Sequence, residues 1–185
     1  MAHALLTLGH GTASREQLLE LLDGAGVEEL VDVRTAPGSR RNPHVARGEL
    51  ARWLPEHGVS YRWERRLGGW RRAPAGSPDT GLRNRSFTGY AAHMRTPEYR
   101  TAVDEVLAAG GPTAVLCSEA VWWRCHRRMI ADFVVLVRGV PVRHLMHDGR
   151  EQDHHPTDVA RLTGDGLLVY DGGQEPLADL PEPQR

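Results

Sequence analysis

The residues most able to do chemistry are concentrated between residues 117 and 128, in Cys117-Ser118-Glu119 and Trp123-Arg124-Cys125-His126-Arg127-Arg128. Glu119 could act as a general acid or base, and Cys117 could act as a nucleophile in its thiolate form. Arg127 could grip a phosphate or carboxylate with two parallel hydrogen bonds, beside the free N–H groups at the start of a helix. The segment therefore predicts acid–base or thiol chemistry on an anionic substrate.

A metal ion is a weaker interpretation of the same segment. Seven residues separate Cys117 from Cys125, which is not a usual spacing for a pair of zinc ligands. His126 directly follows Cys125, and neighbouring side chains on a helix point in different directions. Two cysteines are also too few for a disulfide framework. We therefore predict free thiols, no bound metal and no cofactor.

Short apolar runs alternate with amphipathic stretches along the chain. The expected strands cover Leu5–Leu8, Glu29–Val33, Val59–Trp63, Thr113–Leu116 and Val140–Met146. The first expected helix begins after Ser14, the second spans Glu49–His57, the third begins after Thr96 and the fourth runs from about Arg124 to Val137. Residues 67–86 are expected to form a long loop. This alternation predicts an α/β fold with a mostly parallel sheet and helices on both faces.

Polar residues follow the ends of several expected strands. His10 comes after the first strand, Asp32 and Arg34 follow at the end of the second, and Cys117 and Glu119 come after the fourth. Ligands of parallel sheets bind beside the carboxyl ends of the strands, so these residues should converge. Asp32 either pairs with Arg34 or meets the substrate, and His10 either donates to the substrate or caps the sheet. The expected cleft is lined by His10, Asp32, Arg34, Cys117, Glu119 and Arg127.

The charges are distributed unevenly along the chain. All 23 of the Lys and Arg residues are Arg, and 14 of them lie in residues 34–100, together with five acidic residues. The regions before and after this basic middle are acidic, which indicates an anionic ligand on one face. His147, His154 and His155 lie near the acidic C-terminal region, and we expect them at the surface.

Aromatic residues interleave with these arginines, a pattern typical of proteins that hold single-stranded or flipped nucleotides. We expect Trp70 and Trp122 to be partly exposed, and Trp122 and Trp123 to sandwich a base. We expect nucleic-acid binding to weaken strongly with salt, because residues 40–85, in particular Arg65, Arg66, Arg71 and Arg72, would contact the phosphates. The expected substrate-binding and phosphate-binding residues are Arg34, Arg40, Arg41, Trp70, Arg71, Tyr90, Trp122, Trp123, Arg124, His126 and Arg127.

Several short segments match the pattern of a known family. They are Thr7-Leu8-Gly9-His10-Gly11, Val31-Asp32-Val33-Arg34, Ser39-Arg40-Arg41-Asn42-Pro43, Leu67-Gly68-Gly69, Phe87-Thr88-Gly89-Tyr90-Ala91, Cys117-x-Glu119 and Trp123-Arg124-Cys125-His126-Arg127. Over roughly residues 5–156, the chain resembles the family known as domain of unknown function 488, although Gly11 stands where that family usually has Ser. The resemblance implies a Rossmann-like α/β fold and assigns no reaction.

Three functions fit these residues. The favoured one is an enzyme directed at a nucleic acid or nucleotide that hydrolyses a base–sugar (N-glycosidic) bond, like a DNA glycosylase acting on modified bases. Glu119 or Asp32 would then orient water or stabilise an oxocarbenium ion. One alternative is thiol-based group transfer with Cys117 as nucleophile and Glu119 or His126 as its base. The other is a nucleic-acid-binding protein without catalytic activity.

The length of 185 residues fits one domain. We place this domain at residues 1–165, followed by a C-terminal extension over residues 166–185 whose end we expect to be disordered. The apolar runs are too short to cross a membrane, and the segment Ala2–Leu8 lacks the features of a signal peptide. We therefore expect a cytoplasmic protein with no membrane partner, and the sequence makes no prediction about its oligomeric state.

Overall fold

The computed structural model describes residues 4–173. The first half of the chain contains β1 (Leu5–Gly9), α1 (Arg15–Gly24), β2 (Glu29–Asp32), α2 (Arg47–Glu56), β3 (Ser60–Trp63) and α3 (Arg85–Met94). The second half contains α4 (Pro97–Leu107), β4 (Thr113–Cys117), α5 (Arg127–Arg138), β5 (Val142–Leu145), β6 (Glu151–Asp153), β7 (Ala160–Leu162) and β8 (Leu168–Tyr170). The 3-10 helices η1 (Pro43–Val45), η2 (Arg65–Leu67) and η3 (Trp122–Arg124) lie between them.

The strands β1 to β6 form one sheet in the order β3-β2-β4-β1-β5-β6. The neighbours from β3 to β5 pair in parallel, and β6 pairs antiparallel with β5 at one edge. In the centre of the sheet, residues 6–9 of β1 lie opposite residues 114–117 of β4. The structure thus confirms the mostly parallel sheet and the Rossmann-like α/β fold.

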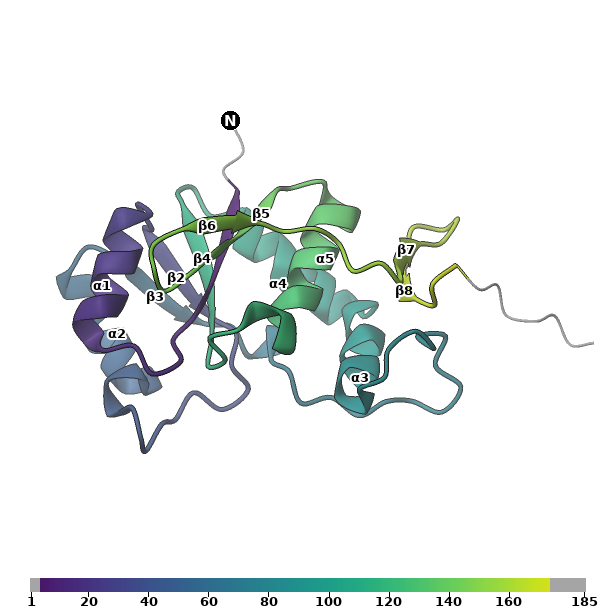
Figure 1. Cartoon of the computed structure of the whole chain (residues 1–185), viewed down its shortest axis with the longest axis horizontal. Coiled ribbons are helices and arrows are strands. Elements are labelled where there is room, and N and C mark those ends of the chain that lie inside the picture. The colour runs from purple at the N-terminus through teal and green to yellow at the C-terminus, as the bar shows by residue number, and fades with distance from the viewer. Residues whose placement is uncertain (1–3, 174–185) are drawn as a thin grey trace, which may run out of the picture.

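Helices cover both faces of this sheet, with α1 and α2 on one side and α4 and α5 on the other (Figure 1). Alternate residues of a strand point to opposite faces, so each strand contributes to two apolar layers. Leu8 and Leu116 pack with α1 and α2, whereas Val115 and Cys117 pack with α4 and α5. None of the described helices has the length and apolar character needed to span a lipid bilayer.

The starts of α1 and α4 are set by local signals that the sequence displays. At α1, Gln17 N donates to Ser14 Oγ at 3.2 Å, and Ser14 N donates to Gln17 Oε1 at 2.8 Å. This capping box satisfies N–H groups that have no partner inside the helix. At α4, Thr96 Oγ1 accepts a hydrogen bond from Tyr99 N at 3.3 Å, and Pro97 occupies the first turn. Both predicted helix starts are confirmed.

The strands β2 and β4 lie side by side, but the chain leaves them in opposite directions. From β2 it passes through α2 to the edge strand β3, and from β4 it passes through α5 to β5, beyond β1. Connections that diverge in this way leave a crevice at the carboxyl ends of the two strands, where open α/β sheets bind ligands. The residues that follow β2 and β4 should therefore form the walls of a site.

The structure contains the helix α3, whereas the sequence predicts a long loop that continues to residue 86. Asn84 caps this helix by accepting a hydrogen bond from Ser86 N at 2.9 Å. Gly89 lets the backbone of Arg71 pack directly on α3, because a Cβ at this position would lie 2.3 Å from the Arg71 carbonyl oxygen. The predicted helix start near Arg124 is also wrong, because η3 precedes α5 as a separate turn.

The antiparallel hairpin of β7 and β8 was not predicted either. Its strands have three residues each, which is too few to display the alternation of apolar and polar residues that indicates a strand. Tyr170 in β8 is fully buried and its hydroxyl donates to Asp132 Oδ2 at 3.0 Å, which ties the hairpin to α5. The expected C-terminal extension therefore begins inside this hairpin. The end of the chain, expected to be disordered, lies outside the described residues.

Candidate functional site

A cavity of about 670 Å³ opens at the carboxyl ends of β2 and β4. Residues 34–36 line it on the β2 side, and residues 117–120 line it on the β4 side. Residues 124–126, before α5, and residues of α3 and its preceding loop complete the wall. Small-molecule sites commonly occupy about 300–1,000 Å³, so the cavity has the size of a ligand site.

The predicted site residues divide between this cavity and the layer behind it. Those that line the cavity are Arg34, Trp70, Tyr90, Cys117, Glu119, Arg124 and His126. The prediction that His10, Asp32 and Arg127 also line it is wrong, because each lies behind the wall and supports a residue or loop of the wall. Sequence reasoning missed Thr35, Ser86 and Phe87, two of which belong to the unrecognised helix α3.

Asp32 is fully buried at the end of β2. Its carboxylate accepts hydrogen bonds from Arg34 Nε at 2.8 Å and from the Tyr61 hydroxyl at 2.7 Å, and it forms an ion pair with Arg34 at 2.5 Å. Arg34 Nη1 lies 3.3 Å from Nε2 of His10, and burial lowers the pKa of His10, so the neutral ring can accept this hydrogen bond. The interpretation of Asp32 and Arg34 as an ion pair is confirmed, and both Asp32 oxygens are occupied.

Arg127 is almost fully buried and fixes the loop after β4, so the prediction that it clamps an anion is wrong. Its guanidinium donates to the carbonyl oxygen of Glu119 and, at 3.3 Å, to that of Ala120. Gly9 packs against the same carbonyl, because a Cβ there would lie 1.9 Å from the Glu119 oxygen. The backbone of Glu119 is therefore held from two sides.

The side chain of Glu119 is exposed on the cavity wall. Its Oε1 accepts one long hydrogen bond from Val121 N at 3.4 Å, and the carboxylate forms no ion pair with another residue between 4 and 173. A carboxylate that is free to meet a substrate, on a backbone held by two contacts, is suited to general acid–base catalysis.

Cys117, Cys125 and His126 meet at the cavity wall, where their donor atoms all lie within 4.8 Å of one another. Nδ1 of His126 is 3.8 Å from Cys117 Sγ and 3.6 Å from Cys125 Sγ. Nε2 of the same ring lies 3.0 Å from the Val33 carbonyl oxygen, so Nε2 carries the proton and the Nδ1 lone pair faces the sulfurs. The predicted divergence of Cys125 and His126 is wrong, because Cys125 has an extended backbone before α5 begins.

The two thiols differ in acidity. The hydrogen bond with Cys117 lowers the pKa of Cys125 well below its usual value despite burial. The same interaction between the cysteines, together with burial, raises the pKa of Cys117 well above its usual value. The backbone N–H of Arg127 donates to Cys125 Sγ at 3.5 Å, so Cys125 is a candidate nucleophile beside the predicted Cys117.

The aromatic residues occupy different environments. Trp70 lines the cavity and is 78% exposed, as predicted. Trp122 stacks on His144 with ring centroids 3.9 Å apart, and neither Trp122 nor Trp123 lines the cavity. Their rings are also nearly perpendicular, at 88°, so the prediction that they sandwich a base is wrong.

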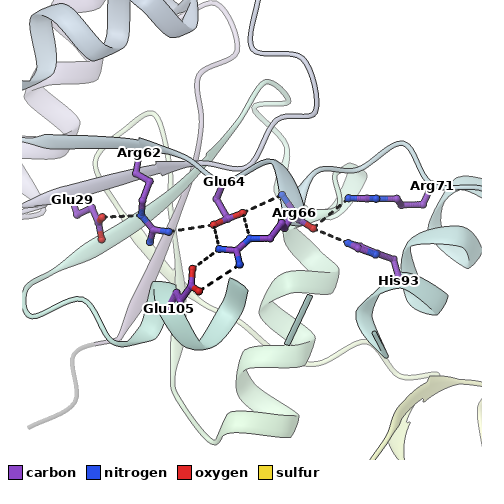
Figure 2. Close-up of polar contacts among 7 residues, drawn as sticks. All are labelled: Glu29, Arg62, Glu64, Arg66, Arg71, His93 and Glu105. Atoms are coloured by element: carbon purple, nitrogen blue, oxygen red, sulfur yellow. Dashed lines mark hydrogen bonds and ion pairs between the residues drawn. The ribbon is translucent and has the colours of Figure 1, made fainter. Parts of the chain in front are cut away.

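Part of the basic region is neutralised inside the protein, as Figure 2 shows. A chain of ion pairs joins Glu29, Arg62, Glu64, Arg66 and Glu105. Arg66 contacts Glu64 at 2.7 Å and also pairs with Glu105, so it is not free for a phosphate, contrary to the prediction. Arg40 and Arg41 are exposed on the loop after β2 and do not line the cavity.

An arginine hollow of about 460 Å³ lies next to the cavity, lined by Arg71, Arg72, Ala73, Arg85 and Ser86. Ser86 lines both spaces. Arg71 donates to the carbonyl oxygens of Gly68 and Arg66 at 3.3 Å, which holds it in place. Arg72 and Arg85 are exposed, and their side chains have no hydrogen bond or ion pair to other residues in the described part of the chain. The hollow thus presents unpaired positive charge.

The three C-terminal histidines do not share one environment. His147 and His155 are exposed, as predicted. His154 is buried and its Nε2 lies 2.8 Å from Asp132 Oδ1, so its predicted surface position is wrong. His147 Nε2 lies 2.6 Å from the Gly9 carbonyl oxygen, beside the end of β1. None of the three histidines lines the cavity.

The comparisons with known proteins identify the family. The model of the family described as "Domain of unknown function DUF488" matches residues 14–134, which is more than half of the chain. No curated protein and no solved structure matches the sequence. The matched region contains the strands β2 and β4 and all residues of the Cys117, Cys125 and His126 cluster. The chain belongs to the family Domain of unknown function DUF488.

Proposed function

We propose that the protein is an enzyme that acts on a nucleotide or nucleic acid and hydrolyses the bond between a base and its sugar, as DNA glycosylases do with modified bases. The cavity would receive the base, extruded from its strand if the substrate is a nucleic acid. The arginine hollow would bind the neighbouring phosphate.

The observation that carries this proposal is the sharing of Ser86 by the cavity and the arginine hollow. A base and its phosphate are separated by one sugar, so a protein that binds both needs an aromatic pocket directly beside a cationic one. Phe87 and Tyr90 line the cavity, while Arg72 and Arg85 line the hollow. All of these except Arg72 lie on α3, within about one and a half turns of that helix.

Glu119 supplies the chemistry in this proposal. When the bond between C1′ and the base nitrogen breaks, its electron pair leaves with the base, and positive charge develops on the sugar. The carboxylate stabilises this charge and orients a water molecule, whose oxygen bonds to C1′ while its proton passes to Glu119. Glu119 then gives this proton to the nitrogen of the released base, which restores the carboxylate. Arg127 and Gly9 fix the backbone of Glu119, so its carboxylate needs little reorganisation during the reaction.

The test is a panel of oligonucleotides and nucleosides with normal and altered bases, with released base measured by chromatography. The variant Glu119→Gln should lose about 100- to 10,000-fold in turnover, the range typical of general acid–base groups. Its substrate affinity should stay close to that of the wild type, because the amide keeps the shape of the carboxylate. Glu20→Gln is the matched control, because Glu20 is exposed on α1 and does not line the cavity.

Thiol-based group transfer is the second candidate, favoured by the low pKa of Cys125 beside His126. It predicts a covalent adduct on Cys125 that intact-protein mass spectrometry would detect when substrate is mixed with excess enzyme. The carboxylate mechanism predicts no adduct on either cysteine. Tight binding of the panel without any released base would instead support a non-catalytic nucleic-acid-binding protein.

A further inference from the structure

We propose that Cys117, Cys125 and His126 form a binding site for one thiophilic divalent cation of the zinc class, with an open coordination position toward the cavity. This inference is independent of the proposed reaction, because it rests on the donor atoms alone. The spacing of these residues in the sequence predicts no bound metal, and this inference contradicts that prediction.

The first support is the distance between the donor atoms. Zinc bonds of about 2.3 Å to sulfur and about 2.0–2.1 Å to nitrogen, at a tetrahedral angle, place sulfur and nitrogen about 3.6 Å apart. Nδ1 of His126 lies 3.6 Å from Cys125 Sγ and 3.8 Å from Cys117 Sγ. Both nitrogen–sulfur distances fit this geometry, and the two sulfurs lie within 4.8 Å of each other.

The second support is the orientation of the imidazole. Metal-binding histidines usually donate their other ring N–H to a carbonyl or carboxylate, which fixes the ring and its tautomer. Nε2 of His126 has this partner in the Val33 carbonyl, at 3.0 Å. The ring also packs edge-on against Tyr90, with centroids 5.2 Å apart. The lone pair of Nδ1 is thus directed at the two sulfurs before any ligand arrives.

The third support is the environment of the sulfurs. Cys117 and Cys125 are 7% and 5% exposed, and two buried thiolates would be costly without a cation between them. The backbone N–H of Arg127 also donates to Cys125 Sγ at 3.5 Å, an outer contact of the kind that supports metal ligands.

The open position follows from the number of ligands. Among the described residues the cluster contains three donors, and all three residues line the cavity. Structural zinc sites have four protein ligands, whereas catalytic sites have three and leave the fourth position to water or substrate. The proposed site is of the second kind, and a bound cation would polarise a water molecule or a substrate oxygen on the same wall as Glu119.

The test uses the full-length protein, reduced, freed of metal with a chelator and titrated with Co²⁺ and Zn²⁺ without any substrate. We expect one Co²⁺ per chain, with the near-ultraviolet absorption of thiolate-to-cobalt charge transfer, and displacement of Co²⁺ by one equivalent of Zn²⁺. Loss of an outer contact typically lowers metal affinity by about 10- to 100-fold, so Cys117→Ser, Cys125→Ser and His126→Gln should each lower it by at least about 100-fold. His155→Gln, at an exposed position, is the control.

A second measurement on the wild type keeps the test decisive if a variant fails to fold. Bound Zn²⁺ should protect both cysteines from alkylation, as read by intact mass. The proposal is overturned if Co²⁺ gives no charge-transfer band, or if alkylation is as fast with Zn²⁺ as without it. It is also overturned if the purified protein is about 2 Da lighter than its sequence requires, regains this mass with reductant and, once reduced, takes up no cation. A disulfide then explains why the two cysteines lie together.

Discussion

Two histidine clusters differ in how fully their hydrogen-bonding atoms are satisfied. In the closed network, His144 Nδ1 lies 2.6 Å from Thr7 Oγ1, and His144 Nε2 lies 3.0 Å from His154 Nδ1. His154 Nε2 lies 2.8 Å from Asp132. Each of these nitrogens therefore has a hydrogen-bond partner. The open cluster of Cys117, Cys125 and His126 has one backbone partner for its imidazole, and the lone pair of Nδ1 faces two thiols at the wall of a cavity.

The difference shows that residue type alone does not locate a functional site. Histidine and aspartate in the closed network satisfy one another, as buried polar groups in proteins generally do, and they hold β8 and α5 together. The open cluster keeps donor atoms available beside a space that a ligand can enter. Buried donors with unused capacity at a cavity are the better mark of function.

The largest expected effect is on stability, through Asp132→Ala in the closed network. This change leaves the polar groups of His154, Thr157 and Tyr170 without their partner, and should lower the free energy of unfolding by about 3 kcal/mol or more. His126→Gln in the open cluster should cost less than half as much, measured by urea denaturation. Equal losses would contradict the distinction between the two clusters.

A smaller effect concerns pH. Burial, with a contribution from His154, lowers the pKa of His144 to about 3, whereas an unfolded histidine titrates near 6.5. Between these values the unfolded chain binds the additional proton, so stability should fall as the pH falls from about 6.5 toward 3. One such group contributes at most about 1.4 kcal/mol per pH unit.

The measurement for this prediction is the free energy of unfolding of wild type and His144→Asn from pH 7 to pH 4. The asparagine variant should start less stable and show a shallower decline, because it removes one titrating group. His155→Asn, at an exposed position, should keep the wild-type slope. A parallel decline in His144→Asn and wild type would show that His144 titrates normally in the folded protein.

The smallest expected effect is on the salt dependence of nucleic-acid binding. If Arg72 and Arg85 each contact a phosphate, the double alanine variant should lower the slope of log affinity against log salt by about 1.4–1.8. Arg66→Ala should leave the slope nearly unchanged, because Arg66 is already paired with Glu64 and Glu105. A lower slope for Arg66→Ala and an unchanged slope for the double variant would instead place the nucleic-acid-binding surface on the chain of ion pairs in Figure 2.

Most of the fold was predictable because its signals are local. The capping pair Ser14 and Gln17 fixes the start of α1, and β1 and β4 are mainly apolar and buried along their whole length because both of their faces are covered. Helix α3 escaped prediction because Gly89, which weakens a helical pattern, is needed for packing on Arg71. That contact is not local in the sequence.

The position of the site was predictable, but the exposure of its residues was not. The carboxyl ends of parallel strands meet at one edge, so Arg34, Cys117 and Glu119 could be brought together from topology. Whether a side chain faces the cavity depends on its neighbours. Arg127 turns inward because the carbonyls after β4 need a donor. Arg85 lies beside Arg72 only because the loop before α3 folds back on that helix.

If the proposed function is correct, the cavity and the arginine hollow form one continuous substrate site. The most direct measurement is single-turnover base release, together with substrate affinity, for Ser86→Trp, which fills the junction between them. The matched control is Thr101→Trp, at an exposed position of α4. We predict that Ser86→Trp folds normally but loses both binding and base release, while Thr101→Trp keeps both. Wild-type binding and release by Ser86→Trp would contradict the claim.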